Sequence, residues 1–193
     1  MINLAQARLA SQHIAQADFA SPEEVVYWMG AMQAQDYQGA LWSIALRMKH
    51  PDITAVEKAI QAGTIVRTWP MRGTLHFISS RDAKWMINLM GPRAARKAAS
   101  RRLTLGITDE TIAKSKSILQ EALHGKKYRS RPDVLALLEA AGIATANQRG
   151  IHILGYLAEH AFVCLGPHIG KQPSFALFDE WLPATPELSR DEA

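Results

Sequence analysis

Apolar residues recur at helical spacing through most of the chain. The run Ser21-Pro22-Glu23-Glu24 is typical of a helix start, because serine caps, proline fits the first turn and acids favour the positive end of the helix dipole. The apolar positions that follow predict a helix continuing through Met32, with its end in the segment 36–39. Further helices are predicted over 4–16, 40–48 and 53–61, the last of them ending at the glycine of Ala62-Gly63.

The period then changes to that of a strand. Residues 64–69 are rich in β-branched and aromatic side chains and predict a strand, followed by a turn at 70–73 and a return strand over 74–78. Helices followed by a short hairpin are the layout of a winged helix, in which one helix enters a DNA groove and the hairpin flanks it.

The same order of elements occurs again in the second half. Helices are predicted over 81–90, 92–102, 108–124, 134–141 and from Thr145 or Asn147 to His160, and strands over 161–165 and 174–178. The residues themselves do not repeat, so only the order of elements does. We therefore expect a mainly α protein with short β-hairpins (α+β) built from tandem winged-helix units.

We expect the first unit and its following basic helices to occupy residues 1–104 and the second unit residues 105–193. The segment 185–193 begins with Thr185-Pro186 and contains Ser189 followed by two acids, which is typical of a helix start without its later turns. We therefore expect a truncated chain.

Composition narrows the class of protein. Apolar residues make up 48% of the 193, which excludes intrinsic disorder. The single cysteine, Cys164, excludes an internal disulfide, and no apolar run approaches the ~18–20 residues of a membrane span. The N-terminus does not resemble a signal peptide, so a cytoplasmic protein without membrane contact is expected.

Charge is unevenly distributed along the sequence. The net charge is +4, but residues 91–131 hold eleven Lys and Arg against three acids. A local positive field of this kind attracts polyanions, although a solvated helical surface also explains it.

Most catalytic signatures are missing from the sequence. It has no glycine-rich phosphate loop and no Gly-x-Ser-x-Gly, and its seven histidines are scattered, so no metal or cofactor is expected. One unusual cluster is Gln33-Ala34-Gln35-Asp36-Tyr37. On an ideal helix its two glutamines point about 200° apart, so both reach one ligand only if the helix ends or distorts there. Capping and a polar surface are the alternative explanation.

A second cluster runs from Arg67 to His76, as Arg-Thr-Trp-Pro-Met-Arg-Gly-Thr-Leu-His. Alternation places Arg67 and Trp69 on one face of the first strand. The cluster is either an ordinary hairpin with a buried Trp69 and surface arginines, or a wing whose Arg72 touches a phosphate.

Together these two clusters, with Ala40-Leu41-Trp42 between them, resemble the bacterial AlkZ/YcaQ-type winged-helix DNA glycosylases. The resemblance extends from about Ala5 to Ala193 and includes the segment Phe175 to Trp181. It implies tandem winged helices around a concave DNA-binding surface, with a third winged helix and a β-rich C-terminal part that this chain lacks. It also implies a monofunctional glycosylase that excises alkylated bases and unhooks interstrand crosslinks. Whether this portion alone is active stays open.

The family's catalytic Gln-aliphatic-Gln motif maps onto Gln33, Ala34 and Gln35. One branch of the family has aspartate at the last position; here Asp36 comes one residue later and is expected to be an electrostatic partner. A carboxamide has no pKa near neutrality and cannot be a general base, but it can hold a water by hydrogen bonds. That is sufficient for an N7-alkylated purine, whose positive charge already weakens its glycosidic bond.

The basic residues are expected to hold the DNA backbone, which supplies affinity independent of sequence. The candidates are Arg72, Arg93, Arg96, Lys97, Arg101, Arg102, Lys126, Lys127, Arg129, Arg131 and Arg149. The expected partner is double-stranded DNA, preferably alkylated, bound by a monomer associated with the nucleoid.

Two alternatives stay open. A non-catalytic winged-helix regulator would read bases through Asn147, Gln148, Arg149 and His152 at the start of a recognition helix. A protein–protein module would use the basic stretch only as a solvated surface.

Overall fold

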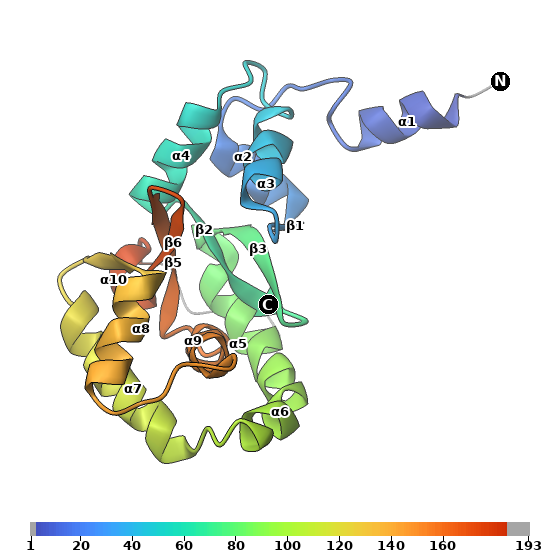
Figure 1. Cartoon of the computed structure of the whole chain (residues 1–193). Coiled ribbons are helices and arrows are strands. Elements are labelled where there is room, and N and C mark those ends of the chain that lie inside the picture. Colours follow the sequence, from blue (N-terminus) through green and yellow to red (C-terminus); the bar gives the residue numbers. More distant parts are fainter. Residues whose placement is uncertain (1–2, 185–193) are drawn as a thin grey trace.

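A computed structural model of the chain describes residues 3–184 (Figure 1). The first half consists of α1 (Leu4–Ser11), α2 (Pro22–Met29), β1 (Ala31–Gln33), α3 (Tyr37–Ala45), α4 (Ile53–Ala62), β2 (Ile65–Met71) and β3 (Thr74–Ser79). Two helices follow, α5 (Ser80–Lys97) and α6 (Ala99–Thr104). The second half consists of α7 (Asp109–Leu123), β4 (Tyr128–Ser130), α8 (Arg131–Ala140), α9 (Arg149–Ala158), β5 (Val163–Ile169), β6 (Gln172–Leu177) and α10 (Phe178–Trp181).

The strands form one six-stranded antiparallel sheet in the order β1-β3-β2-β5-β6-β4. The first half supplies β1-β3-β2 and the second half supplies β5-β6-β4, so the two halves have the same pairing in mirror order. They meet where β2 pairs with β5, with Arg67 opposite Leu165. The α+β class is therefore confirmed, and a single sheet runs through both halves.

Three apolar clusters fill the interior. One packs α2, α3 and α4 against the first half of the sheet, and a second packs α7, α8 and α9 against β5 and β6. The third lies under α5 and joins both halves, since it contains Val66 and Ile87 together with Cys164 and Trp181. Cys164 is fully buried, and burial raises the pKa of its thiol, in agreement with the role of a small core residue.

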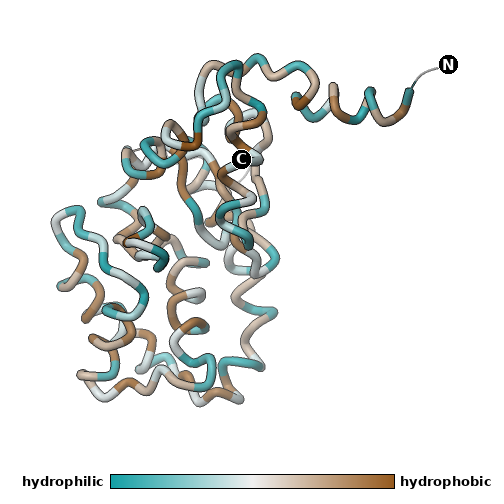
Figure 2. The backbone as a smooth tube through the Cα atoms, turned by 45° about the horizontal axis from the view of Figure 1, so that its top comes forward, coloured by the Kyte–Doolittle hydropathy of each residue, from teal (hydrophilic) through white to brown (hydrophobic). Residues whose placement is uncertain are grey.

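Helix α1 lies apart from these clusters. It projects from the body of the molecule (Figure 1), and apolar and polar positions mix along its turns (Figure 2). It has no buried residue, and Leu4 is 72% exposed.

The predicted extent of the second helix was wrong. Helix α2 ends at Met29 because Gly30 has φ +72° and ψ −66°, a backbone conformation that glycine adopts without a steric penalty. The chain then continues as β1, which pairs with β3. The segment 36–39 is not a helix end: Asp36 precedes the first turn of α3, which begins at Tyr37.

The predicted helix boundary at residues 90–92 was also wrong. Helix α5 continues through Pro92 to Lys97, and the break comes at Ala98. Proline leaves the carbonyl four residues earlier without its helical partner, but that residue, Asn88, is exposed, so water can satisfy it. The expected helix start at Ser189 lies outside the described residues.

Within residues 3–184, no helix combines the length and the apolar character needed to cross a membrane.

Candidate functional site

The two glutamines lie on the exposed side of the chain after α2, with Gln33 at the end of β1 and Gln35 at the bend that follows it. From Met32 to Gln35, side chains alternate strictly: Met32 and Ala34 are buried, whereas Gln33 and Gln35 are exposed. Residues two apart in an extended chain point to the same side, so the 200° separation expected on a helix does not apply. The small, fully buried Ala34 occupies the inward position between them.

One backbone and one side-chain hydrogen bond fix this segment against β3. The Ala34 N–H donates to the Leu75 carbonyl at 2.8 Å, and the Leu75 N–H donates to Gln35 Oε1 at 2.8 Å. The carboxamide of Gln35 thus extends the strand pairing by one step. This hydrogen bond orients the carboxamide; its –NH₂ group can donate to a ligand, and its oxygen keeps a second lone pair.

A buried arginine holds the same segment from behind. Arg67 Nε and Nη2 donate to the Ala34 carbonyl at 2.9 and 2.6 Å, and Nη2 approaches the Gln35 carbonyl at 3.4 Å. The guanidinium lies 5.3 Å from the centre of the Tyr37 ring, which stacks on His168 at 3.6 Å. Burial lowers the pKa of Arg67, while Tyr37 and Asp36 act in the opposite direction.

The expectation of surface arginines in the hairpin therefore fails for Arg67, whose residual exposure is 7%. Burial, together with the charge of Arg67, also lowers the pKa of His168, which keeps that imidazole neutral beside the guanidinium. Sequence reasoning did not single out Tyr37 and His168 for this role. Their separation of 131 positions along the chain leaves no local signal.

Asp36 is exposed and precedes α3 without a capping hydrogen bond from its side chain. The Asp36 carboxylate occupies the space next to Gly39, one turn later, where a Cβ would collide with it. Its charge favours the protonated form of Arg67, so it acts on the residue that holds the glutamine segment.

Gln35 lies on the wall of a pocket of about 410 Å³. This volume falls within the roughly 300–1,000 Å³ of small-molecule sites. One wall comes from the first half of the chain and contains Gln35, Trp69, Gly73 and Leu75. The other wall comes from α6 and α9 and contains Arg102, His152, Tyr156 and Glu159. Gln33 is not among the lining residues.

The β2–β3 hairpin carries Arg72 at its tip. Arg72 is exposed and has φ +56° beside Gly73 at φ +71°, so the tip is a tight two-residue turn. His76 lies opposite Gln33 in the strand register but is buried, and its Nδ1 contacts the Thr74 carbonyl at 2.9 Å. Burial and Arg72 together lower the pKa of His76.

The candidate DNA-contacting residues of α5 and α6 differ in their exposure to solvent. The exposed members are Arg93, Arg96, Lys97 and Arg101. Arg102 is half-buried: its Nη1 donates to the Ala95 carbonyl at 2.8 Å, and its guanidinium lies 4.5 Å from the Tyr156 ring centre. Arg102 therefore belongs to the pocket wall rather than to the open surface.

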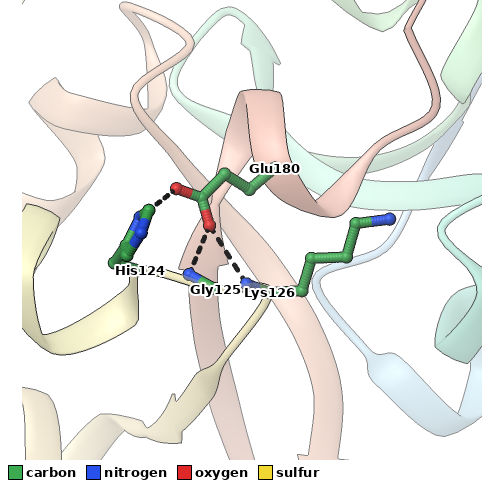
Figure 3. A network of polar contacts seen from close by, with 4 residues as sticks. All are labelled: His124, Gly125, Lys126 and Glu180. Atoms are coloured by element: carbon green, nitrogen blue, oxygen red, sulfur yellow. Dashed lines mark hydrogen bonds and ion pairs between the residues drawn. The ribbon is translucent and has the colours of Figure 1, made fainter.

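The second basic group surrounds β4, the edge strand farthest from β1. Lys126 and Lys127 are exposed, Arg129 Nε donates to the Ala122 carbonyl at 3.1 Å, and Arg131 begins α8. Glu180 organises the turn before β4 by accepting hydrogen bonds from the Gly125 and Lys126 N–H groups, whereas the Lys126 side chain extends away from it (Figure 3). These bonds and the contact with His124 lower the pKa of Glu180.

The residues expected to read bases in a regulator do not form one free surface. Asn147 and Gln148 are exposed, but Gln148 accepts a hydrogen bond from Arg101 at 3.0 Å. Arg149 donates to the carbonyls of Ala144 and Leu105. His152 lies in the pocket wall, where burial and two arginines lower its pKa.

The described part of the chain contains no group of three or more His, Cys, Asp or Glu placed to hold a metal ion. The site thus offers two amides on one face, a pocket with two aromatic walls and one buried carboxyl, Glu159. Sequence reasoning missed Glu159, which follows α9 in an unremarkable Leu-Ala-Glu-His run.

Comparison with known proteins places the chain in a class of DNA-repair proteins. Residues 26–193 match the DNA glycosylase AlkZ-like family, so the chain belongs to that family. In sequence it is 25% identical over 162 residues to an interstrand DNA cross-link repair glycosylase of Streptomyces sahachiroi, covering 81% of this chain and 43% of the relative.

In structure the chain is similar to the Streptomyces sahachiroi DNA glycosylase AlkZ, with a TM-score of 0.75 and 25% identity. The match covers 93% of this chain and 51% of that protein. The chain thus spans about half the length of the relatives it matches.

Proposed function

We propose that this chain forms the DNA-binding and catalytic portion of a glycosylase that excises N7-alkylated purines and unhooks interstrand crosslinks. The observation that carries the proposal is the alternating burial from Met32 to Gln35, which leaves Gln33 and Gln35 exposed, with Gln35 at a pocket. Family membership supports the reaction class.

The repeated element order supports tandem winged helices. The series α2–β1–α3–α4–β2–β3 recurs as α7–β4–α8–α9–β5–β6, and in each series the early short strand pairs with the far strand of the hairpin. Helices followed by a flanking hairpin match the winged-helix arrangement for DNA binding. The division at residue 104 follows the same repeat.

The chemistry requires little from the protein beyond positioning. When the glycosidic bond of an N7-alkylated purine breaks, the bonding electrons neutralise the cationic base, which leaves readily. The sugar cation then takes a water oxygen, and the water proton passes to solvent. Gln33 and Gln35 hold that water, and Asp36 stabilises the positive charge from a distance.

Removing the amides tests this function. We expect Gln35→Ala to reduce release of N7-methylguanine from alkylated duplex DNA by at least tenfold with unchanged DNA affinity, because the amide orients water rather than binding the duplex. Base release is measured directly by chromatography, and Gln38→Ala, an exposed glutamine on α3, is the matched control. Full activity of the Gln33→Ala/Gln35→Ala double variant would rule out the mechanism. A sequence-specific footprint without base release would support the regulator instead.

A further inference from the structure

Glu159 occupies a position that is unfavourable for a carboxylate. It directly follows α9, at the end where the helix dipole is negative, and it is only 6% exposed. Among the described residues, none of the three ion pairs within 4 Å includes it. Burial raises its pKa to about 7 although Arg102 acts in the opposite direction.

Close packing fixes the backbone at this point. Helix α5 approaches the Glu159 carbonyl so closely at Gly91 that a Cβ on Gly91 would collide with the carbonyl oxygen. The Glu159 N–H donates to the Gly155 carbonyl at 2.8 Å. The backbone of Glu159 is therefore fixed, and Glu159 lines the same pocket as Gln35.

Two aromatic side chains are among the other lining residues of the pocket. Trp69 and Tyr156 both line the pocket, and Trp69 is itself held nearly parallel to Phe175, with an interplanar angle of 9°. Aromatic side chains stack on nucleobases, and each stacked base contributes about 1–3 kcal/mol. Arg102 from α6 favours the ionised form of the carboxyl, whereas burial, Arg101 and Arg102 lower the pKa of His152 from α9.

We infer that this pocket receives the extruded damaged base and that Glu159 recognises it as a cationic purine. An N7-alkylguanine carries a positive charge and presents N–H donors on its Watson–Crick edge. An ionised carboxylate only accepts hydrogen bonds, and its charge-assisted bonds are roughly twice as strong as neutral ones. An enzyme that acts on a base must bring it out of the stack into such a pocket. The inference rests on the proposed function, because that function is what brings a damaged base from DNA to the pocket.

Nucleoside binding tests the inference without requiring catalysis. We expect the purified 193-residue chain to bind 7-methylguanosine, a cationic nucleoside, more tightly than guanosine in titration calorimetry. Glu159→Gln keeps the shape of the side chain but removes its charge, and we expect it to weaken 7-methylguanosine binding about tenfold or more with little effect on guanosine. Glu110→Gln, exposed in the first turn of α7, is the matched control. Circular dichroism verifies the fold of each variant.

Equal binding of both nucleosides, unchanged affinity in Glu159→Gln, or no binding up to the solubility limit would overturn the inference. Its failure is distinct from failure of the proposed function. If alkylated DNA loses its base equally well with Glu159→Gln and with the unmodified chain, glycosylase activity stands and the recognition role falls. If no base is released but nucleoside binding depends on Glu159, the recognition role stands and the proposed glycosylase activity falls. Gln33→Ala, outside the pocket lining, is expected to lose base release and keep nucleoside binding.

Discussion

Arg67 and Glu159 are buried ionisable side chains with different surroundings. Arg67 gives its donors to the carbonyls of Ala34 and Gln35, so its charge is partly compensated by backbone dipoles. Glu159 has no comparable partner in the described structure, and burial raises the pKa of its carboxyl to about 7, so the protonated and ionised forms are both populated near neutral pH. Arg67 therefore shapes the site through hydrogen bonds, whereas Glu159 can gain a negative charge inside the pocket.

This difference predicts a pH-dependent stability. The folded Glu159 has a pKa of about 7, above the ordinary value of 4.5, so the folded state binds the proton more tightly than the unfolded state. Its contribution is fully present below pH 4.5 and is lost as the pH rises through 7. We expect Glu159→Gln to remove this loss, so that the variant gains about 1–3 kcal/mol relative to the unmodified chain between pH 5 and pH 8. Urea unfolding at a series of pH values measures it, and parallel stability curves would contradict it.

The conformation of the glutamine segment depends on the turn between α2 and β1. Gly30 has a positive φ, and a Cβ added there would meet nothing within 4 Å. Substitution therefore acts only through backbone strain, without a steric clash to a neighbour. The turn ends α2 and lets the chain continue as β1, and the pairing of β1 with β3 leaves Gln33 and Gln35 exposed on the same side.

We expect Gly30→Ala to lower the free energy of unfolding by about 1–2 kcal/mol and to reduce base release beyond the loss of folded protein. The control for stability alone is Gly155→Ala, which also has open space around the added Cβ but lies inside α9 without a positive φ; base release is not compared there because Gly155 lines the pocket. There we expect a gain of about 0.5–1 kcal/mol. Chemical denaturation measures both, and equal effects of the two substitutions would contradict the strain argument.

Local signals predicted the elements with strong caps or long periods. Helix α4 runs from Ile53 to Ala62 and is followed by Gly63, as the sequence indicated, and both hairpins were foreseen. The three-residue strand β1 was not, because Met32 fits the apolar period of α2 and only pairing with β3 makes the segment extended. The family motif identified Gln33 and Gln35, but their shared face depends on that long-range pairing.

The pocket was beyond sequence reasoning for the same physical reason. Glu159 looks like a solvated residue at a helix end, but it is buried, and α5 packs against its backbone at Gly91, 68 positions earlier. Gln35, which lines the same pocket, lies in the other half of the chain. Burial created by packing between distant elements leaves no periodic signal in the sequence.

The continuous sheet makes both halves of the chain one body with two separate basic groups. The exposed cations of α5 and α6 lie near the pocket, whose lining includes Ala98 and Arg102. Strand β3 contributes Leu75 to the pocket lining. The basic group at β4 lies four strand positions from β3, or roughly 19 Å at the usual interstrand spacing of about 4.8 Å. A duplex held by both groups would lie across the width of the sheet rather than along one helix.

Salt dependence of DNA binding tests this arrangement. Each phosphate-contacting Lys or Arg that is removed lowers the slope of log K against log salt by about one, because one fewer counterion is released. We expect Arg96→Gln/Lys97→Gln and Lys126→Gln/Lys127→Gln each to lower the slope by about two. Lys49→Gln/Lys58→Gln removes the same charge from exposed positions outside both groups and should leave the slope unchanged. Fluorescence anisotropy with an undamaged duplex at several salt concentrations measures the slopes. An equal decrease in the control pair would show that net charge, rather than contact at these two groups, holds the DNA.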